Sequence, residues 1–532
     1  MKNNIRRSIS FAAALIMCTA AVSGCGEKKE SATKTSTLNF EGYPVNTDET
    51  LTWYMPLSQE LSQVTATMES TPFAKELEKK TGIKVKYEHP PIGQEEERFN
   101  IMLSADKLPD LISYEWYKYA GGPSKAIDEK VIMKLTDIIA KDAPNLKKYL
   151  DEHPEIDKMV KDDDNDYYCF PFLRGDESLL VSCGPIIRKD WLDELGLDMP
   201  ETMDDWHTVL KAFKEKKGAA APLTMQTYIL SLGDFVGAYG VKKDFSVENG
   251  KVVYGPYDER YREFLKTFSE WYKEGLIDKD IASVDAKSLD TNFLNAKSGA
   301  TVYYSGAGIG RWQNAIASKD PNAEFVPVSH PVLNKGETPK FGQKDTWYVS
   351  RGAVAVSTSC KNPSLAARLL DYGYSEDGGM LFNFGVEGES YNMKDGYPTY
   401  TDKILKNPDG LSMGAALSSY AMAADCGPFI QDKRYIEQYY SNPNQKQALE
   451  VWAKSDADKN SLPKITLNSE ESKETASLLT SIQTYVDEHT VRFITGAENI
   501  DSFDSYLKGL EDLGINKVIE VYQKAYERYM HR

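Results

Sequence analysis

Hydrophobic and polar positions along the chain follow two patterns, one typical of strands and the other typical of helices. In residues 83–88 apolar side chains alternate with lysine or glutamate, which predicts a strand with one buried face. In residues 202–214 the apolar side chains recur at a spacing of three and four, which predicts a helix with one buried stripe formed by Trp206, Val209, Leu210 and Phe213. Strand and helix patterns alternate along much of the chain, which indicates an α/β protein.

The first half of the folded chain predicts a mostly parallel sheet with helices on its faces. Strands are expected over residues 51–57, 83–88 and 109–113, and helices over residues 71–82 and 95–105. Ligands of open parallel sheets bind beyond the carboxyl ends of the strands. We therefore expect ligand contacts from Trp53 after the first strand, and from Glu115 and Trp116 after the third.

The pattern in the middle of the chain indicates that the chain passes there into a second domain. Residues 179–187 are expected to form a buried strand or a crossing, followed by helices over residues 188–195 and 202–214. Residues 299–304 predict another strand, and three glycines alternate in residues 305–310 just after it. No Lys-Ser or Lys-Thr pair follows, so a nucleotide-binding loop is not indicated. The interpretation is a turn whose backbone amides face a ligand, with Tyr303, Tyr304 and Trp312 nearby.

The N-terminus has the layout of an export signal. Basic residues precede an apolar run over residues 9–22, about 14 residues long, whereas a membrane-spanning helix needs about 20. Small residues then lead to Cys25, which predicts a lipobox; an ordinary cleaved signal beside an incidental cysteine is the alternative. Residues 26–50 are polar and lack the apolar surface that folding requires, so they are expected to form a flexible tether.

Composition narrows the classes of partner. The net charge of −17 argues against nucleic acid and against an electrostatic hold on anionic lipid. Four cysteines beyond the N-terminal region lack the spacing of a metal site and are expected to be buried thiols, with a Cys169–Cys183 bridge as the alternative. The acidic run at residues 162–166 lacks the glycine and closing glutamate of a calcium loop, which favours a charged turn. No metal and no cofactor is predicted.

Residues 188–214, with the sequence RKDWLDELGLDMPETMDDWHTVLKAFK, resemble the extracellular solute-binding lipoproteins that deliver oligosaccharides to ABC importers, particularly the large members from Gram-positive bacteria. Other stretches resemble that family in the same order, namely TWYMP, TGIKVKY, FNIMLSADKLPDLIS and FNFGVEGESYNM. Many members carry a calcium-type loop after the second of these helices, but residues 215–222 of this chain have no ligand set for it.

The resemblance implies a two-lobe periplasmic-binding-protein-like α/β fold (class II type), with a mostly parallel sheet in each lobe and a ligand cleft between the lobes. The expected boundaries are a signal peptide over residues 1–24, a tether over 25–50, a first lobe over 51–178 and about 350–400, and a second lobe over 179–349 and about 401–532.

The predicted function is that of a substrate-binding lipoprotein that is not an enzyme. It would capture an oligosaccharide by aromatic stacking and hydrogen bonds and pass it to an ABC permease, as a monomer anchored through lipidated Cys25 to the extracellular face of the membrane. The same architecture binding a peptide or another solute is the alternative, and a secreted glycoside hydrolase is a further one. An acidic ligand would be expected to contact Arg174 or Arg311, whereas a neutral sugar requires neither. The predicted ligand contacts are Trp53, Glu115, Trp116, Arg174, Asp176, Tyr303, Tyr304, Trp312, Trp347, Glu387 and Tyr391.

Overall fold

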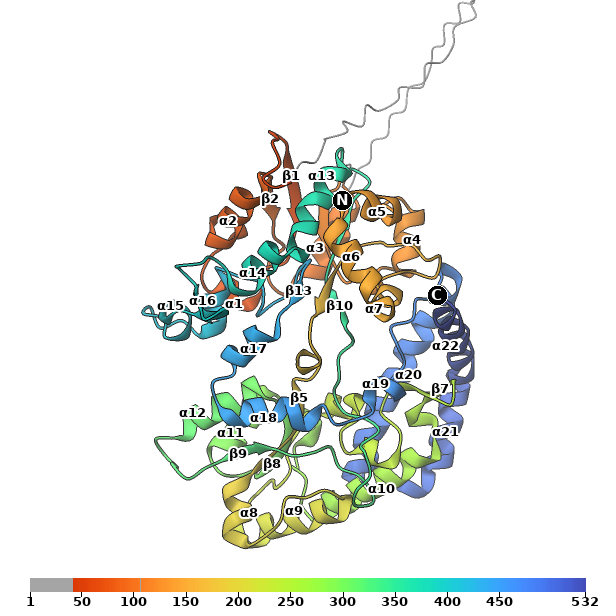
Figure 1. Cartoon of the computed structure of the whole chain (residues 1–532). Coiled ribbons are helices and arrows are strands. Elements are labelled where there is room, and N and C mark those ends of the chain that lie inside the picture. The colour runs from red at the N-terminus through yellow and green to blue at the C-terminus, as the bar shows by residue number, and fades with distance from the viewer. Residues whose placement is uncertain (1–41, 106) are drawn as a thin grey trace, which may run out of the picture. The chain divides into compact units, whose positions relative to one another are not determined.

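Two main sheets organise the part of the chain that the computed structural model describes, residues 42–105 and 107–532 (Figure 1). We call the residues packed around the six-stranded sheet the first lobe and those packed around the three-stranded sheet the second lobe. The predicted signal, Cys25 and most of the predicted tether lie outside the described residues.

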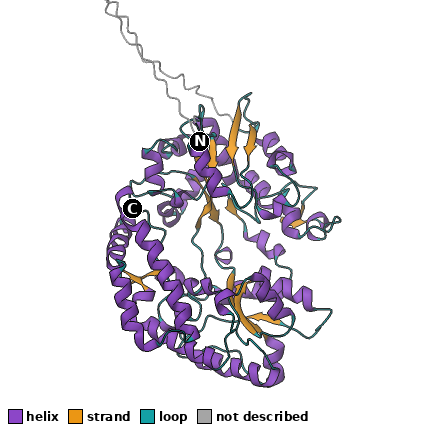
Figure 2. Cartoon of the chain, turned by 180° about the vertical axis from the view of Figure 1, so that it is seen from behind, coloured by secondary structure: helices purple, strands orange, loops and turns teal. Residues whose placement is uncertain are grey.

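The sheet of the first lobe has the strand order β13-β4-β10-β3-β1-β2. Its strands are β1 (Thr50–Tyr54), β2 (Lys84–Glu88), β3 (Leu111–Ser113), β4 (Phe170–Arg174), β10 (Tyr348–Val356) and β13 (Ile430–Gln431). Strand β1 is parallel to β2 and β3, as the alternation of strands and helices predicts, whereas β10 enters the middle of the sheet antiparallel to β3 and β4. Helices lie around these strands (Figure 2).

Local sequence signals account for the helices of the first lobe. Thr71 caps the first turn of α2 (Pro72–Thr81) by accepting a hydrogen bond from the Ala74 amide, and Gly82 ends the helix with a φ of 73°. The other helices of this lobe up to residue 384 are α1 (Gln59–Ser62), α3 (Glu95–Leu103), α4 (Gly122–Asp128), α5 (Thr136–Asp142), α6 (Pro144–Glu152), α7 (Pro154–Met159), α13 (Pro363–Asp371) and α14 (Glu376–Phe384).

The sheet of the second lobe is antiparallel, which corrects the expectation of a mostly parallel sheet there. Strand β5 (Cys183–Arg188) lies between β8 (Ala300–Tyr304) and β9 (Phe325–Pro327) and is antiparallel to both. Strands β8 and β9 are joined through α12 (Arg311–Ile316), and such a crossover makes them run in the same direction. The strand between them runs the other way because the chain enters it from the first lobe.

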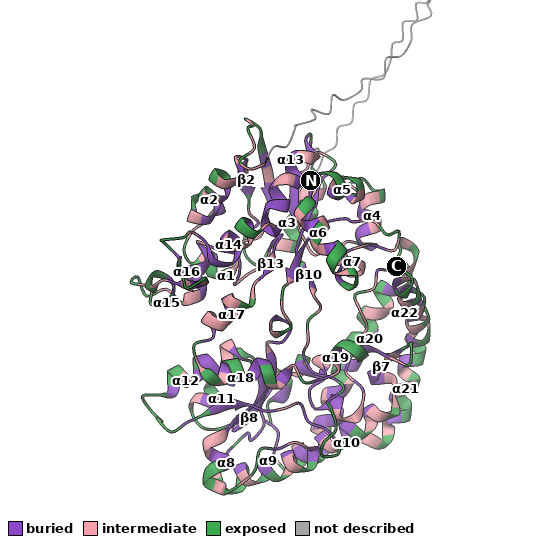
Figure 3. Ribbon diagram, in the orientation of Figure 1, coloured by how far each residue is buried: buried purple, intermediate pink, exposed green. Residues whose placement is uncertain are grey.

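Alternate side chains of β5 face two different hydrophobic cores, as the pleat of a strand requires. Cys183 and Ile187 pack in a core with α8 (Lys189–Leu195) and α9 (Met203–Lys217), whereas Ile186 packs with Trp312 and Trp452. Thr202 caps α9 in a capping box with Asp205. Strands β5, β8 and β9 are buried except for Tyr304 at the end of β8, and the outer faces of the helices are exposed (Figure 3).

The chain stays with the first lobe beyond residue 400, which corrects the expected boundary at about 401. Strand β13 pairs parallel with β4, and α16 (Met413–Ser418) packs against α1. The chain reaches the second lobe at α18 (Pro443–Trp452), where the Trp452 indole donates to the carbonyls of Pro185 and Val328. The segment between holds β11 (Tyr391–Lys394), β12 (Tyr397–Tyr400), α15 (Asp402–Leu405) and α17 (Lys433–Tyr439), which are too short to give a periodic sequence signal.

Long amphipathic helices close the second lobe. Helix α20 (Ser469–Thr495) packs on α10 (Glu259–Lys273), and α21 (Phe503–Asp512) is separated from α22 (Ile515–Met530) by a break at Gly514, whose φ is 92°. The remaining elements of this lobe include α11 (Ala286–Leu294), α19 (Ala457–Asn460), β6 (Phe245–Glu248) and β7 (Lys251–Tyr254).

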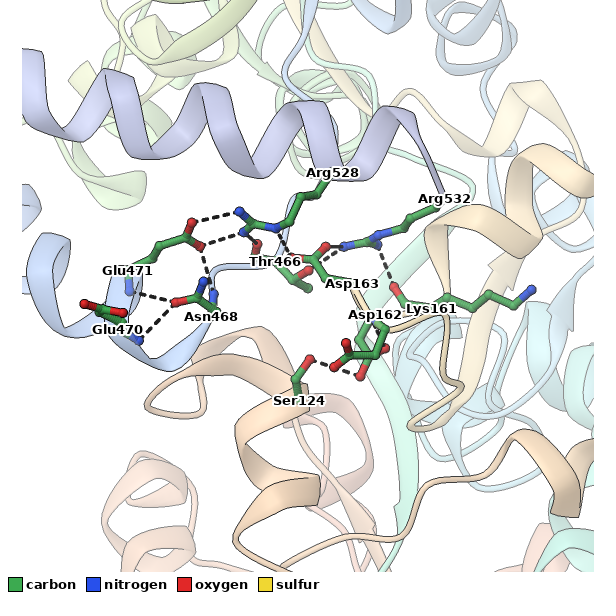
Figure 4. Close-up of polar contacts among 11 residues, drawn as sticks. Ser124, Lys161, Asp162, Asp163, Thr466, Asn468, Glu470, Glu471, Arg528 and Arg532 are labelled. Atoms are coloured by element: carbon green, nitrogen blue, oxygen red, sulfur yellow. Dashed lines mark hydrogen bonds and ion pairs between the residues drawn. The ribbon is translucent and has the colours of Figure 1, made fainter.

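The acidic run at residues 162–166 is a charged turn, and the C-terminal end of the chain, which belongs to the second lobe, contacts it (Figure 4). Asp163 accepts hydrogen bonds from Arg528, at 2.9 Å, and from Arg532, whose guanidinium also donates to the Lys161 carbonyl at 2.6 Å. Arg528 forms a second, bidentate pair with Glu471 at the start of α20. We call Asp163, Arg528 and Arg532 the C-terminal clasp.

The described cysteines Cys169, Cys183, Cys360 and Cys426 are free thiols, so the alternative of a Cys169–Cys183 bridge is not realised. Within residues 42–105 and 107–532, no group of three or more histidine, cysteine, aspartate or glutamate side chains is arranged to hold a metal ion. None of the helices in this part of the chain is long and apolar enough to span a membrane.

Candidate ligand-binding site

A cavity of about 550 Å³ opens at the carboxyl ends of β1 and β3 in the first lobe. This is the edge of the parallel strands at which the sequence predicts ligand contacts. We call it the first-lobe cavity. Its wall consists of Trp53, Tyr54, Met55, Pro56, Leu57, Ser58, Gln59, Glu60, Glu95, Glu96, Ser113, Tyr114, Glu115, Lys118, Arg351, Gly352, Met422, Ala424, Asp425, Cys426 and Gly427.

Aromatic side chains at the end of β1 form the floor of this cavity. The Trp53 indole is held by a hydrogen bond from its Nε1 to Ser113 Oγ at 2.8 Å and stacks on Tyr87 with ring centroids 5.8 Å apart. Burial raises the pKa of Tyr54 to about 12, so its hydroxyl remains protonated, and it donates to the Glu95 carbonyl at 3.4 Å. Because Trp53 is almost entirely buried, it offers an edge of the ring rather than an open face.

Carboxylates outnumber cations in the wall. The acidic members are Glu60, Glu95, Glu96, Glu115 and Asp425, and the basic members are Lys118 and Arg351. Lys118 lies 3.3 Å from Glu115, while one oxygen of Glu95 accepts the Gly93 amide at 2.9 Å. Burial raises the pKa of Asp425, and the charge of Arg351 opposes that effect.

Two of the predicted tryptophans are inside the protein. Trp116 is fully buried among Phe99, Tyr114 and Tyr119 and does not reach the cavity wall. Trp312 is fully buried as well, and neighbouring aromatic rings cover its indole. Stacking of a sugar on either indole would require neighbouring rings to move away.

The indole of Trp312 lies between two aromatic rings of the second lobe. Phe293 stacks on one side with centroids 4.3 Å apart, and Tyr303 stacks with centroids 5.5 Å apart. Its Nε1 donates to Asp290 at 2.8 Å. Tyr303 is itself buried, whereas the next residue, Tyr304, is 39% exposed at the end of β8. Of the three aromatics predicted here, the structure brings Tyr304 to the surface.

An exposed partner of Tyr304 gave no sequence signal. Tyr228 is 41% exposed, and its hydroxyl interacts electrostatically with that of Tyr304. Tyr228 lies in a short 3₁₀ segment, Thr227–Leu232, which has neither strand nor helix periodicity. Only the fold places it beside β8. We call Tyr228 and Tyr304 the tyrosine pair.

The glycine-rich residues 305–310 do not form the predicted open turn. They continue directly into α12 through a π-helical turn, Gly306–Gly310, and the Gly310 amide donates to the Ser305 carbonyl at 3.1 Å. A Cβ on Gly310 would lie 2.3 Å from Gln445 Nε2, so this glycine permits the close approach of α18. This segment therefore starts the helix and packs against α18, and the contact of its backbone amides with a ligand stays a prediction.

The other predicted contacts line separate hollows. Asp176, Glu387 and Tyr391 belong to an open hollow of about 890 Å³ beside α14 and α17, whereas Trp347 lines one of about 390 Å³ near α19 and α22. The Arg174 guanidinium hydrogen bonds to Gln431 and lies 3.3 Å from Asp345. The first-lobe cavity thus unites Trp53 and Glu115 of the predicted set. It adds residues that sequence reasoning missed, notably Glu60, Glu95, Glu96, Arg351 and Asp425.

The signals for these missed residues differ. Glu60 and Glu95 follow the carboxyl ends of β1 and β2 along the chain, so the same strand-end rule applied to every following segment would have found them. Arg351 and Asp425 come from β10 and from the segment before β13, far along the sequence, and only the sheet order brings them to this edge.

Comparisons with known proteins agree with this architecture. The model of the family "Bacterial extracellular solute-binding protein" matches residues 66–380, more than half of the chain. Lipoprotein LipO of Bacillus subtilis is 27% identical over 69% of this chain and 75% of its own length. The fructooligosaccharide ABC transporter substrate-binding protein FusA of Streptococcus pneumoniae is 26% identical over 98% of both chains.

Among solved structures, the alginate-binding protein AlgQ2 superposes with a TM-score of 0.73 at 25% identity, covering 90% of this chain and 99% of that one. These similarities extend over both lobes, and FusA and AlgQ2 are both named as binding proteins. The chain therefore belongs to the bacterial extracellular solute-binding protein family, is a two-lobe α/β binding protein and is not an enzyme.

Proposed function

We propose that this protein captures an oligosaccharide, with the first-lobe cavity as one wall of the site and the tyrosine pair as the aromatic surface of the second lobe. The observation that carries the proposal is the composition of the first-lobe cavity. It combines a tryptophan edge, tyrosine hydroxyls and carboxylates at the carboxyl ends of parallel strands. Aromatic rings suit the C–H faces of sugars, and carboxylates accept hydrogen bonds from sugar hydroxyls.

The available contacts are sufficient for capture without covalent chemistry. Two or three aromatic contacts at about 1 kcal/mol each beyond area burial, with several hydrogen bonds at about 1 kcal/mol each, approach the roughly 8 kcal/mol of micromolar binding. Closure of the two lobes around the ligand would bury it, the hinge motion that two-lobe binding proteins use.

The comparisons support transport as the purpose of capture. A relative that this chain matches along 98% of its length is named as a fructooligosaccharide ABC transporter substrate-binding protein, and AlgQ2 is named as alginate-binding. We infer that this chain passes its sugar to the membrane permease of an ABC importer. A peptide as the ligand would need fixed charges for its termini and main-chain partners.

We further propose that Cys25 is lipidated and anchors a monomer to the extracellular face of the membrane. The support is the apolar run that ends in small residues before Cys25, and the name of the relative LipO as a lipoprotein. Substituting Cys25→Ala should move the protein from the membrane fraction to the medium of producing cells. A protein that stays in the membrane fraction after this substitution would contradict the anchor.

A thermal-shift screen of the chain from Gly26 onward tests the main proposal. The panel holds neutral and acidic oligosaccharides, short peptides and amino acids, and each mixture is checked for cleavage by chromatography. A ligand at 100 times its dissociation constant should add about 2.7 kcal/mol to the free energy of unfolding. A shift with oligosaccharides that remain intact is expected. A response to peptides alone would assign the site to another solute.

A further inference from the structure

We propose that the site selects an uncharged oligosaccharide and rejects one that carries carboxylates. This inference rests on the proposed function, because it concerns which sugars the first-lobe cavity accepts. The relatives themselves do not decide the question, since one is named for fructooligosaccharides and another for alginate, a polymer of uronic acids. The charges of this chain's own side chains do decide it.

The wall of the first-lobe cavity has an excess of negative charge. Its five carboxylate side chains stand against two cationic ones, a formal charge of −3 around a volume of about 550 Å³. Glu60 and Glu96 are exposed, and Glu115 and Asp425 are half-buried. A uronate residue would bring a further negative charge among these groups, and like charges at short range oppose association.

The two cations of the wall differ in their partners. Lys118 Nζ lies 3.3 Å from Glu115 Oε2, so binding a uronate through Lys118 would leave Glu115 without its counter-charge. The Arg351 guanidinium interacts electrostatically with Cys426 and then with Asp425, Glu115 and Asp345, but it forms no ion pair with a described residue. Arg351 is thus one cation set against the five carboxylates of the wall.

The two arginines expected to contact an acidic ligand are also committed within the protein. The Arg311 guanidinium makes a bidentate pair with Asp290 at 2.5 and 2.6 Å, in which both carboxylate oxygens are used. Arg174 is engaged by Gln431 and Asp345. Neither Arg311 nor Arg174 is therefore a free bidentate fork of the kind that carboxylate recognition favours.

A neutral sugar satisfies the same wall without any added charge. Its hydroxyls donate to the carboxylates, which are acceptors only when ionised, and its C–H faces suit the tyrosine pair. Burial raises the pKa of Tyr304, so its hydroxyl stays neutral and can donate or accept. The hydroxyls of a neutral ligand thus complement the carboxylates of the wall.

Isothermal titration calorimetry tests the inference. The ligands are trisaccharides of matched length, namely neutral fructo-, malto- and manno-oligosaccharides, trigalacturonate, trimannuronate and the trisaccharide of glucosamine. At least one neutral trisaccharide should bind, and the uronates should bind at least about 100-fold more weakly, a difference of about 2.7 kcal/mol.

A charge variant with a matched control shows whether the wall causes the selectivity. The double variant Glu60→Gln and Glu96→Gln keeps the size of both exposed side chains and removes two charges. The ratio of neutral to uronate affinity should fall about tenfold. Glu215→Gln, an exposed glutamate of α9 that is absent from the cavity wall, should leave both affinities unchanged.

The outcomes separate the inference from the function on which it rests. Uronates binding as tightly as neutral sugars, or glucosamine oligomers binding in preference to neutral ones, overturn the inference and leave oligosaccharide capture standing. An unchanged ratio in the double variant overturns the role of this wall. If none of the sugars binds, or peptides alone bind, the proposed function itself fails.

Discussion

Single residues of the same chemical type have different roles in this protein, and burial decides which. Tyr304 and Trp312 lie eight positions apart and both follow the pattern of a ligand-contacting aromatic, yet one is 39% exposed and the other is fully buried. The covered indole is part of the second-lobe core. Affinity should therefore depend on the tyrosine and stability on the tryptophan.

Tyr304→Ala should raise the dissociation constant of the sugar about tenfold, because it removes one stacking surface worth roughly 1 kcal/mol together with a hydrogen bond. Tyr304→Phe keeps the ring and should recover most of that loss. Trp312→Ala should instead lower the free energy of unfolding by about 3 to 5 kcal/mol through the cavity that it leaves. Calorimetric titration and chemical denaturation of the three variants distinguish these effects, and an unchanged affinity in Tyr304→Ala would remove the tyrosine pair from the site.

Asp163 makes a pH-dependent contribution to stability. Burial acts to raise its pKa, but hydrogen bonds from Thr466, Arg532 and Arg528 outweigh burial, and the pKa is lowered. A carboxyl whose pKa is lower in the folded state than in the unfolded state stabilises the fold fully above the unfolded value, about 3.9, and loses that contribution as the pH falls through the folded value.

We therefore expect the free energy of unfolding to decline below about pH 4 and to decline less steeply in Asp163→Asn. Urea unfolding at a series of pH values measures both slopes. Asp164→Asn, one position along in the same turn, serves as the control because no ion pair of Asp164 is seen in the described structure. Equal slopes in the wild-type protein and Asp163→Asn would refute the linkage.

At the scale of elements, the glycines of residues 306–310 reveal where two helices meet. A Cβ on Gly310 would collide with Gln445 of α18, whereas the nearest atom to a Cβ on Gly306 is 3.6 Å away on Tyr440. Gly310→Ala should therefore lower the free energy of unfolding by about 1 to 3 kcal/mol, the usual cost of overpacking. Gly306→Ala, in the same helical turn, should be tolerated. Thermal melts compare the two variants. Equal melting temperatures would mean that α18 moves away from residue 310 without any loss of stability.

The elements with strong local signals could be predicted from the sequence. Helix α9 has the cap at Thr202 and a clear apolar stripe, and α2 has Pro72 at its start and Gly82 at its end. The antiparallel second sheet and the late return to the second lobe could not be predicted, because strand direction and partner are non-local. A two-residue strand such as β13 has no periodicity at all.

In the candidate site, the sequence predicts only the residues that directly follow a strand. Trp53 and Glu115 follow β1 and β3 directly, so the strand-end rule finds them. Trp116, the next residue, has the same sequence context as Glu115 but is turned into the core beside Phe99. Composition does not tell which neighbour faces a cavity. The direction of each side chain is set by packing that the sequence pattern does not encode.

At the scale of the whole molecule, the C-terminal clasp joins the two lobes through charged side chains. Helix α22 packs in the second-lobe core through Val518, and Arg528 and Arg532 at its end contact Asp163 next to the first-lobe sheet (Figure 4). The Arg532 side chain is 1% exposed, so its pair with Asp163 is shielded from water and from salt.

Arg532→Ala leaves Asp163 with a weaker set of partners and should lower the free energy of unfolding by about 3 kcal/mol. The substitution should also weaken the coupling between the unfolding of the two lobes, so that the calorimetric unfolding transition broadens or divides into two. Lys524→Ala, an exposed residue on the same helix, is the control. A single sharp transition with an unchanged midpoint would show that the clasp does not couple the lobes.

The position of β10 in the first sheet determines when the first lobe can fold during synthesis. This strand lies between β3 and β4, yet it is made about 175 residues after β4. Until residue 356 has emerged, the edges of β3 and β4 lack their partner, and unpaired edges invite association with other chains. The first lobe therefore cannot be completed as it is synthesised from the N-terminus. Folding has to wait for a late segment, and a chain interrupted before residue 348 would be prone to aggregation rather than a smaller working binding protein.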